Sequence, residues 1–192
     1  MTTLILKLDV AGRPIGWVSR EAGALLYCRN QVAWEAGEHF VHLRGGYSRL
    51  LGTRSVLNVN TIIATRSLDR VADIGGVPAL TNRQLFRRDG FMCLYCARQF
   101  AATELTRDHV TPTSRGGRDT WENVVTACRT CNHRKDNRTA TELDAVGMRL
   151  VAVPYAPNRA EALILANRRI LADQMAFLRS HIGKMSRLNH SS

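Results

Sequence analysis

The chain has 192 residues, which suits one domain of ordinary size or two small domains that share a core. Its hydrophobic content of 45%, with 6% aromatic residues, excludes a disordered tail. The formal net charge is +11, and 24 of the 27 basic residues are arginine, which favours a polyanionic partner. A basic surface can also serve only to keep a protein soluble.

The charge is spread along the chain, and its middle is the most positive part. Residues 83–138 carry eleven basic and six acidic side chains, a net of +5, whereas residues 1–82 and 139–192 each carry a net of +3. The first ten residues show no basic stretch followed by a long apolar run, and no window approaches the length of a membrane span. We therefore expect a cytoplasmic protein with no membrane partner.

A hairpin and a helix are predicted at the start of the chain. Residues 3–10 and 15–18 are apolar or alternate around a turn, which is typical of a β-hairpin. Ser19 is the expected N-cap of a helix that continues to about Cys28, itself expected to be a small buried side chain. The side chains expected to face inward from this helix are Ala22, Leu25 and Leu26.

Three further strands are predicted before a glycine-rich boundary. Apolar patterns indicate strands at 31–34, 39–43 and 55–64. The stretch 74–82 then marks a break in the pattern. Residues 1–80 are therefore expected to form a mixed N-terminal subdomain of helices and strands.

The next segment, residues 81–140, reads as a small α+β core. Its predicted elements are, in order, a short helix ended by Gly90, a tight turn at 91–100, a strand at 105–110, a polar loop at 112–120, a strand at 122–126 and a helix at 129–138.

Residues 141–192 form a predicted C-terminal extension with one long helix. Asn158 and Glu161 have the spacing of a capping box directly after Pro157. Apolar residues then recur with helical spacing over about seven turns, which predicts an amphipathic helix. Such a helix can pack against its own domain or form a two-fold contact in a homodimer.

Two cysteine pairs predict a structural zinc site. Cys93 and Cys96, and again Cys128 and Cys131, have the spacing that lets four thiolates surround one Zn²⁺ ion. With all four positions filled by sulfur, the metal has no site left for water. Disulfides are the weaker interpretation for a cytoplasmic protein.

The segment from Arg88 to Thr139 resembles the HNH (ββα-metal) endonucleases, in particular those with a four-cysteine zinc site. The motifs that carry this resemblance are RDGFMCLYC, DHVTPTSRGG, WENVVTAC and CNHRKDNRT, in that order. The stretch LDVAGRPIGWVSREAGALL is similar to the start of small stand-alone bacterial members of the family. The resemblance implies a zinc-stapled ββα core within an α+β protein.

The resemblance also implies a role for each polar motif residue. His109 would be the general base, Asp108 a ligand of the catalytic metal, and Asn123 the residue that orients the histidine. Asn132 would be the second metal ligand, with His133 as a contender. A hard oxygen ligand such as Asp108 suits Mg²⁺ or Mn²⁺. Adjacent strand residues point to opposite faces, so we expect either a local bend or the end of the strand to direct Asp108 and His109 into one site.

Several positions are secondary candidates or depart from the family pattern. Gly116 and Gly117 are expected to shape a loop. Three departures are Arg107 in place of an apolar residue, and Ala97 and Asp136 in place of glycine; Arg107 and Asp136 could form a pair. Candidate phosphate contacts, each of which could also be a solvated charge, are Arg115, Arg118, Arg134, Lys135 and Arg138.

The combined prediction is a metal-dependent DNA endonuclease with His109 as base, leaving a 5′-phosphate and a 3′-hydroxyl. One alternative is a zinc-knuckle DNA-binding module without catalysis. Another is a structural or partner-binding protein whose tail helix is the functional surface. The motifs do not identify the DNA sequence, structure or modification that is recognised.

Overall fold

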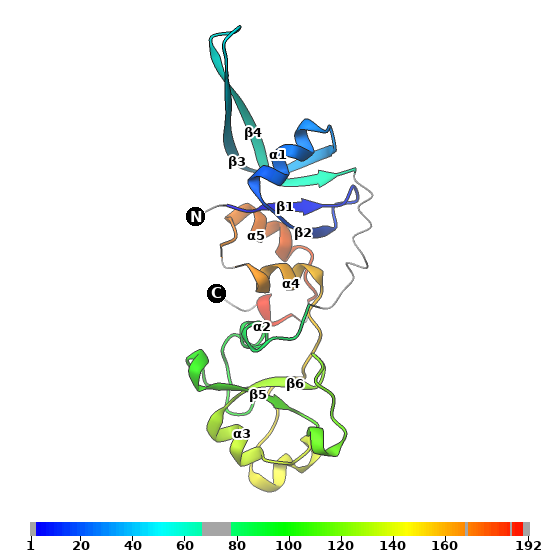
Figure 1. Cartoon of the computed structure of the whole chain (residues 1–192). Helices are drawn as coiled ribbons and strands as arrows, with labels where there is room; N and C mark the ends of the chain where they lie inside the picture. Colours follow the sequence, from blue (N-terminus) through cyan, green and yellow to red (C-terminus); the bar gives the residue numbers. More distant parts are fainter. Residues whose placement is uncertain (1–2, 67–77, 168, 185, 190–192) are drawn as a thin grey trace. The chain divides into compact units, whose positions relative to one another are not determined.

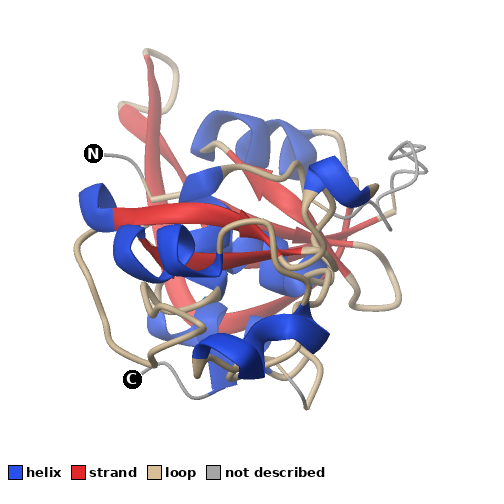
Figure 2. Cartoon of the chain, turned by 90° about the horizontal axis from the view of Figure 1, so that it is seen from below, coloured by secondary structure: helices blue, strands red, loops and turns tan. Residues whose placement is uncertain are grey.

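The computed structural model describes residues 3–66, 78–167, 169–184 and 186–189, so residues 74–77 of the predicted boundary lie outside the described part. The chain divides into two compact units. Unit 1 comprises Met1–Gly76 and Arg159–Ile182, and unit 2 comprises Val77–Asn158 and Gly183–Ser192. Helices and strands occur together throughout the described chain (Figure 2), which confirms the α+β class.

Unit 1 contains a four-stranded mixed sheet with the strand order β2-β1-β4-β3. Its strands are β1 (Ile5–Leu8), β2 (Pro14–Val18), β3 (Val32–Ser48) and β4 (Thr53–Thr65). The β1–β2 pair is the predicted hairpin, and β1 runs parallel to β4. The strands predicted at 31–34 and 39–43 are one strand, β3, because a register shift between Ala36 and Phe40 lets it stay paired with β4.

The first helix, α1 (Arg20–Cys28), begins as predicted, but its buried face differs. Ser19 Oγ accepts a hydrogen bond from the Ala22 N–H at 3.2 Å, which confirms the N-cap. Gly23 is the point of closest approach to the sheet, since a Cβ there would lie 2.5 Å from the side chain of Ile5. Leu25, two residues on, therefore points away and is 53% exposed, and Cys28 is also exposed rather than buried.

The tail forms two short helices instead of one long helix. These are α4 (Arg159–Ala166) and α5 (Ala172–Arg179). The Asn167 side chain accepts from the Arg169 N–H at 3.1 Å, a local bond that competes with helix continuation. The Gln174 side chain then accepts from the backbone N–H one residue before α5, at 3.1 Å. Apolar periodicity alone could not detect this interruption.

Both tail helices pack within unit 1. The buried side chains of α4 are Ala160, Glu161, Ala162, Leu163, Ile164 and Leu165. In α5, Gln174 is buried and its Nε2 donates to the carbonyls of Leu4 and Thr61, each at 2.9 Å. The carboxylate of the neighbouring Asp173 lies 3.0 Å from Nδ1 of His39 in β3. Helix α5 therefore contacts the segment that leads into β1, strand β4 and strand β3.

Unit 2 contains the elements predicted for the core. They are α2 (Asn82–Arg88), β5 (Leu105–His109), β6 (Val124–Cys128) and α3 (Arg129–Lys135), with short 3-10 turns at Ala102–Glu104, Thr113–Arg115, Ala140–Val146 and Arg187–Asn189. Strands β5 and β6 form an antiparallel two-stranded sheet (Figure 1). No helix in the described part of either unit is long and apolar enough to cross a membrane.

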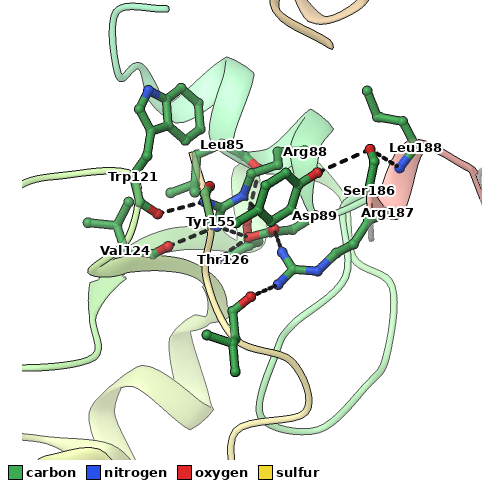
Figure 3. A network of polar contacts seen from close by, with 11 residues as sticks. Leu85, Arg88, Asp89, Trp121, Val124, Thr126, Tyr155, Ser186, Arg187 and Leu188 are labelled. Atoms are coloured by element: carbon green, nitrogen blue, oxygen red, sulfur yellow. Dashed lines mark hydrogen bonds and ion pairs between the residues drawn. The ribbon is translucent and has the colours of Figure 1, made fainter. Parts of the chain in front are cut away.

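A buried arginine at the end of α2 connects distant parts of unit 2 (Figure 3). Arg88 is fully buried, and its guanidinium donates to the carbonyls of Trp121, Val124 and Tyr155, each at 2.8 Å. It also pairs with the carboxylate of Asp89 at 2.9 Å. The aromatic rings of Trp121 and Tyr155 lie 5.3 and 5.5 Å from its guanidinium carbon.

Asp89 extends this network to the C-terminal segment. Its carboxylate accepts from the Thr126 N–H at 2.9 Å and from the guanidinium of Arg187. Arg187 also donates to the carbonyl of Val153 at 2.6 Å. The buried carboxylate thus has two cationic partners and a backbone donor, which compensate for its desolvation.

We predict that Arg88→Leu lowers the free energy of unfolding of unit 2 by about 3–5 kcal/mol, because it leaves Asp89 and three carbonyls buried without their partner. Urea denaturation followed by circular dichroism measures the loss. Arg83→Leu, at an exposed position of the same helix, is the control and should change stability by less than about 0.5 kcal/mol. A loss below about 1 kcal/mol for Arg88→Leu would contradict this role of the network.

Candidate active site and metal centre

Four cysteine side chains converge in unit 2. The Sγ atoms of Cys93, Cys96, Cys128 and Cys131 all lie within 4.8 Å of one another. One pair is on the turn after α2, and the other lies at the junction of β6 and α3. Zn–S bonds of about 2.3 Å in a tetrahedron need sulfur separations of this order, so the cluster can bind a zinc ion.

The cluster is electrostatically prepared for a cation. Burial raises the pKa of the Cys96 thiol, but hydrogen bonds from the backbone and guanidinium of Arg98 outweigh this and lower the pKa to about 7. Burial and the neighbouring thiols raise the pKa of Cys131. Four thiolates can therefore coexist here only when a metal ion neutralises their mutual repulsion.

Two residues that depart from the family pattern have left-handed backbone conformations. Ala97, directly after the first cysteine pair, has φ +57°, and Asp136, at the end of α3, has φ +50°. Glycine adopts such angles without steric cost, whereas residues with a Cβ do not. The common glycine at these positions is thus a backbone requirement, which Ala97 and Asp136 meet under strain.

The regular pairing of β5 with β6 separates Asp108 from His109. Their partners on β6 are Val125 and Val124, with no register shift between them. No bend occurs within β5, and the pairing stays regular as far as His109, the last residue of the strand, so the two side chains lie on opposite faces. Neither a bend nor the strand end directs both side chains into one site in this conformation.

Asp108 points toward the interior, where it is 5% exposed. The Tyr95 hydroxyl donates to its Oδ2 at 2.5 Å, and the Lys135 ammonium donates to its Oδ1 at 3.1 Å. Burial raises the pKa of the Asp108 carboxyl, while Tyr95 and Lys135 act in the opposite direction. Lys135 also donates to the carbonyl of His109 at 2.8 Å, so this buried lysine ties α3 to the end of β5.

His109 belongs to a chain of polar contacts on the other face of β5. Its Nε2 lies 2.9 Å from Oδ1 of Asp119, and Oδ2 of Asp119 accepts from Arg107 at 2.5 Å. Arg107 is oriented in turn by the Asn82 side chain at 2.9 Å. The pKa of the Asp119 carboxyl is lowered, chiefly by the hydrogen bond from Arg107. Asp119 is therefore ionised at neutral pH and accepts the proton of Nε2.

Sequence reasoning missed Asp119, which lies in the polar loop without a motif of its own. The one available signal was Arg107, a charged residue where an apolar one is usual. The suggested pairing of Arg107 with Asp136 is wrong, because Arg107 and His109 are two residues apart on the same face of β5 and both reach Asp119.

Asn123 holds the loop that follows His109 instead of contacting the imidazole. Its Oδ1 accepts from the Thr111 N–H at 2.9 Å, and its Nδ2 donates to the carbonyls of Thr111 and Arg118 at 3.0 and 2.9 Å. Its backbone carbonyl accepts from the N–H of Val110 at 2.8 Å. At Gly117 a Cβ would lie 1.7 Å from the Thr111 carbonyl oxygen, so the closed loop requires glycine there.

Asn132 and His133 share one hollow beside α3. The residues that line this α3 hollow are Thr106, Arg129, Asn132, His133 and Asp136. The Asn132 Nδ2 donates to Thr106 Oγ1 at 3.0 Å. The structure thus brings both contenders for the last motif position to one surface, and Asp108 is not among the residues that line it.

The candidate phosphate contacts differ in how freely they are presented. Lys135 is buried, and Arg115 pairs with Glu142 at 2.8 Å. That pairing and two bonds from Thr139 lower the pKa of the Glu142 carboxyl to about 2. Arg134 and Arg138 donate to backbone carbonyls. Arg118 is exposed, and its side chain has no partner in the described part of unit 2.

The donor set between β5 and α3 fits a hard divalent cation in its chemistry. Mg²⁺ is usually held by one or two carboxylates together with substrate phosphates and water. Asp108 and Thr106 lie on the β5 face that contacts α3, where Asn132 adds an amide oxygen. The Lys135 ammonium neutralises Asp108 in this conformation, so a metal ion there must share or displace that ion pair.

Comparison with families of known proteins finds a match within unit 2. Residues 93–145 match a family described as HNH endonuclease. This segment is similar to HNH endonucleases. The match spans the cysteine cluster, β5, β6 and α3.

Other comparisons add less. The structure shows a slight likeness to the crystal structure of the Type II-C Cas9 enzyme from Actinomyces naeslundii, with a TM-score of 0.31 and 19% identity over 58% of this chain. The matched part covers 13% of that enzyme, and a likeness of this size does not establish a shared fold. No curated protein sequence matches the chain.

The cysteine cluster predicts that the purified protein contains about one zinc ion per chain and that unit 2 requires it. Structural zinc contributes about 10–16 kcal/mol of apparent binding free energy, so Cys96→Ser and Cys131→Ser should lose zinc and unfold unit 2. Mass spectrometry of the metal content and thermal melting measure both effects. Cys28→Ser should keep zinc, and equal zinc loss in that control would contradict the assignment.

The strained backbone at Asp136 predicts that Asp136→Gly raises the free energy of unfolding by about 1 kcal/mol, since glycine removes the Cβ conflict at positive φ. Urea denaturation measures the gain. Asp144→Gly, at an exposed position without this geometry, should be neutral or destabilising. A stability loss in Asp136→Gly as large as that of the control would show that the backbone is not strained.

Proposed function

We propose that the protein is a DNA endonuclease in which His109 is the general base of phosphodiester hydrolysis. The observation that carries the proposal is the contact chain from His109 to Asp119 to Arg107 within an HNH domain. An imidazole oriented by a carboxylate is a recurrent arrangement for proton transfer. His109 and Asp119 are both partly exposed, so a substrate has access to them.

The contact with Asp119 selects the nitrogen that reacts. Because the ionised Asp119 accepts from Nε2–H, the lone pair of His109 lies on Nδ1. Nδ1 then takes the proton from a water molecule that attacks the phosphorus in line with the leaving group. Asp119 stabilises the imidazolium that results, and Arg107 keeps Asp119 ionised.

The divalent metal is the second component of the proposal. Asp108 and Asn132 would hold Mg²⁺ or Mn²⁺, with His133, which lines the α3 hollow, as a further donor. Asp108 lies on the opposite face of β5 from His109 and is paired with Lys135, so the proposal requires its carboxylate to leave Lys135 and turn toward the phosphate that His109 reaches. When bound, the ion would act as a Lewis acid that stabilises charge on the phosphate and on the departing 3′-oxygen. The products are a 5′-phosphate and a 3′-hydroxyl.

Removing the base or its carboxylate predicts graded losses of plasmid cleavage. His109→Ala should reduce the rate by about 10²–10⁴-fold, the usual contribution of a general base. Asp119→Asn should reduce it by about tenfold to a hundredfold, because a neutral amide no longer stabilises the imidazolium that forms in the reaction. Nicking of supercoiled plasmid with Mg²⁺ or Mn²⁺ measures both rates.

Two controls complete this experiment. Asp144→Asn changes an exposed carboxylate of the same unit and should cut at the wild-type rate. Chelation should stop cutting, and Mg²⁺ added back should restore it while the zinc content stays constant. Wild-type rates in His109→Ala would overturn the assignment of the base. DNA binding with no cutting under any metal would favour a zinc-containing DNA-binding module.

A further inference from the structure

The hairpin of β3 and β4 extends well beyond the strands it pairs with (Figure 1). Strand β4 meets β1 only at Ile62–Ala64, whereas β3 and β4 remain paired as far as Ser48 and Thr53. We call residues 42–58 the arm. Val41 and Val59, at its base, are buried in unit 1. Beyond Leu43 and Leu57 both strands are exposed, apart from the partly buried Ser48.

The arm is basic and has no acidic residue. Between His39 and Arg66 the sequence contains no aspartate or glutamate. Arg44, Arg49 and Arg54 lie in the arm, all are exposed, and their side chains have no partner in the described part of unit 1. These positive charges are therefore neither neutralised locally nor used to stabilise the fold.

The end of the arm presents large apolar side chains in a defined turn. Leu50 is 94% exposed, and Leu51 and Tyr47 are also strongly exposed. The turn is closed by a bond from the Gly52 N–H to the Ser48 carbonyl at 2.9 Å, and Ser48 Oγ accepts from the Leu51 N–H at 3.2 Å. Gly52 has φ +63°, which suits this turn. The backbone therefore holds the leucines outward.

We propose that the arm is a DNA-binding β-ribbon that helps to hold the substrate of the nuclease; this rests on the proposed function of the HNH domain. A two-stranded β-ribbon has the width of the DNA major groove. Unpaired arginines on both strands match the phosphates that flank a groove. Exposed leucines at the end of the ribbon can contact the apolar C5-methyl groups of thymine in the same groove.

The charge distribution favours DNA over a second copy of the chain. Two arms that meet would bring six arginines together with no carboxylate between them, which is electrostatically unfavourable. Phosphates supply the missing negative charge at regular spacing. Because the arm and the HNH domain share one chain, contact at the arm would raise the effective concentration of DNA at the active site.

Fluorescence anisotropy tests the inference by measuring the binding of a labelled DNA duplex over a series of KCl concentrations. All variants carry His109→Ala, so that binding is measured without cutting. Arg44→Ala/Arg49→Ala/Arg54→Ala should weaken binding and reduce the slope of log affinity against log salt by about 2.7, or about 0.9 for each lost phosphate contact. Leu50→Ser/Leu51→Ser should weaken binding about tenfold at an unchanged slope.

The matched control is Arg29→Ala/Arg66→Ala/Arg169→Ala, which removes the same charge from exposed positions of unit 1 outside the arm. For this control, the slope of log affinity against log salt should differ from that of the His109→Ala protein by less than about 0.9, the value for one phosphate contact. Equal slopes for the arm and control variants would overturn the inference. A wild-type dimer in light scattering that the leucine variant converts to monomer, with DNA binding unchanged, would also overturn it and identify the arm as a self-association surface.

Plasmid cleavage by the same variants in the wild-type background separates this inference from the proposed function. Cutting that depends on His109 but not on the arm leaves the nuclease intact and rejects the arm. Binding that depends on the arm, without any cutting, supports the arm and rejects the nuclease. Melting temperatures close to the wild-type value show that each variant is folded.

Discussion

The two-stranded sheet of unit 2 depends on the buried pair of Arg88 and Asp89. A β-hairpin alone is marginally stable in water, and β6 exposes one row of backbone groups on the side away from β5. Arg88 binds the Val124 carbonyl of that row, and Asp89 binds the Thr126 N–H. The last turn of α2 thus replaces a third strand. Arg88 also bonds to Tyr155, and Asp89 bonds to Arg187 (Figure 3). Segments that are far apart in sequence therefore stabilise the sheet.

The cysteine cluster stabilises the other end of β6. Cys128 is the last residue of β6 and the N-cap of α3, so a metal bound there fixes the strand, the helix and the turn at Cys93 together. With β6 clamped at both ends, β5 pairs with it without a bulge, and strict alternation follows. Alternation then places Asp108 in the interior, beside Lys135. It places His109 at the surface, beside Asp119. The two neighbouring motif residues therefore lie on different sides of one strand, one toward α3 and one toward the loop.

The elements that sequence reasoning predicted are those encoded within a few residues. The Ser19 cap, the first hairpin and the two cysteine pairs each depend on local spacing. What it missed depends on contacts between segments that no local pattern records. Leu25 has the helical spacing of a core residue, but the close approach of Gly23 to the sheet turns it outward. Asp119 is one of several polar loop residues until folding places it beside His109.

Counting charges along the chain also gives a misleading picture of where positive charge is available. The middle of the sequence is its most positive part, yet much of that charge is committed to internal partners. The basic residues bonded in this way are Arg88, Arg107, Arg115, Arg134, Lys135 and Arg138. The arm belongs to a segment with a smaller net charge, but its arginines are exposed and have no acidic neighbours in sequence. Since a phosphate binds most readily to a cation that no carboxylate already neutralises, the arm is a stronger candidate for the first contact with DNA than the most basic segment.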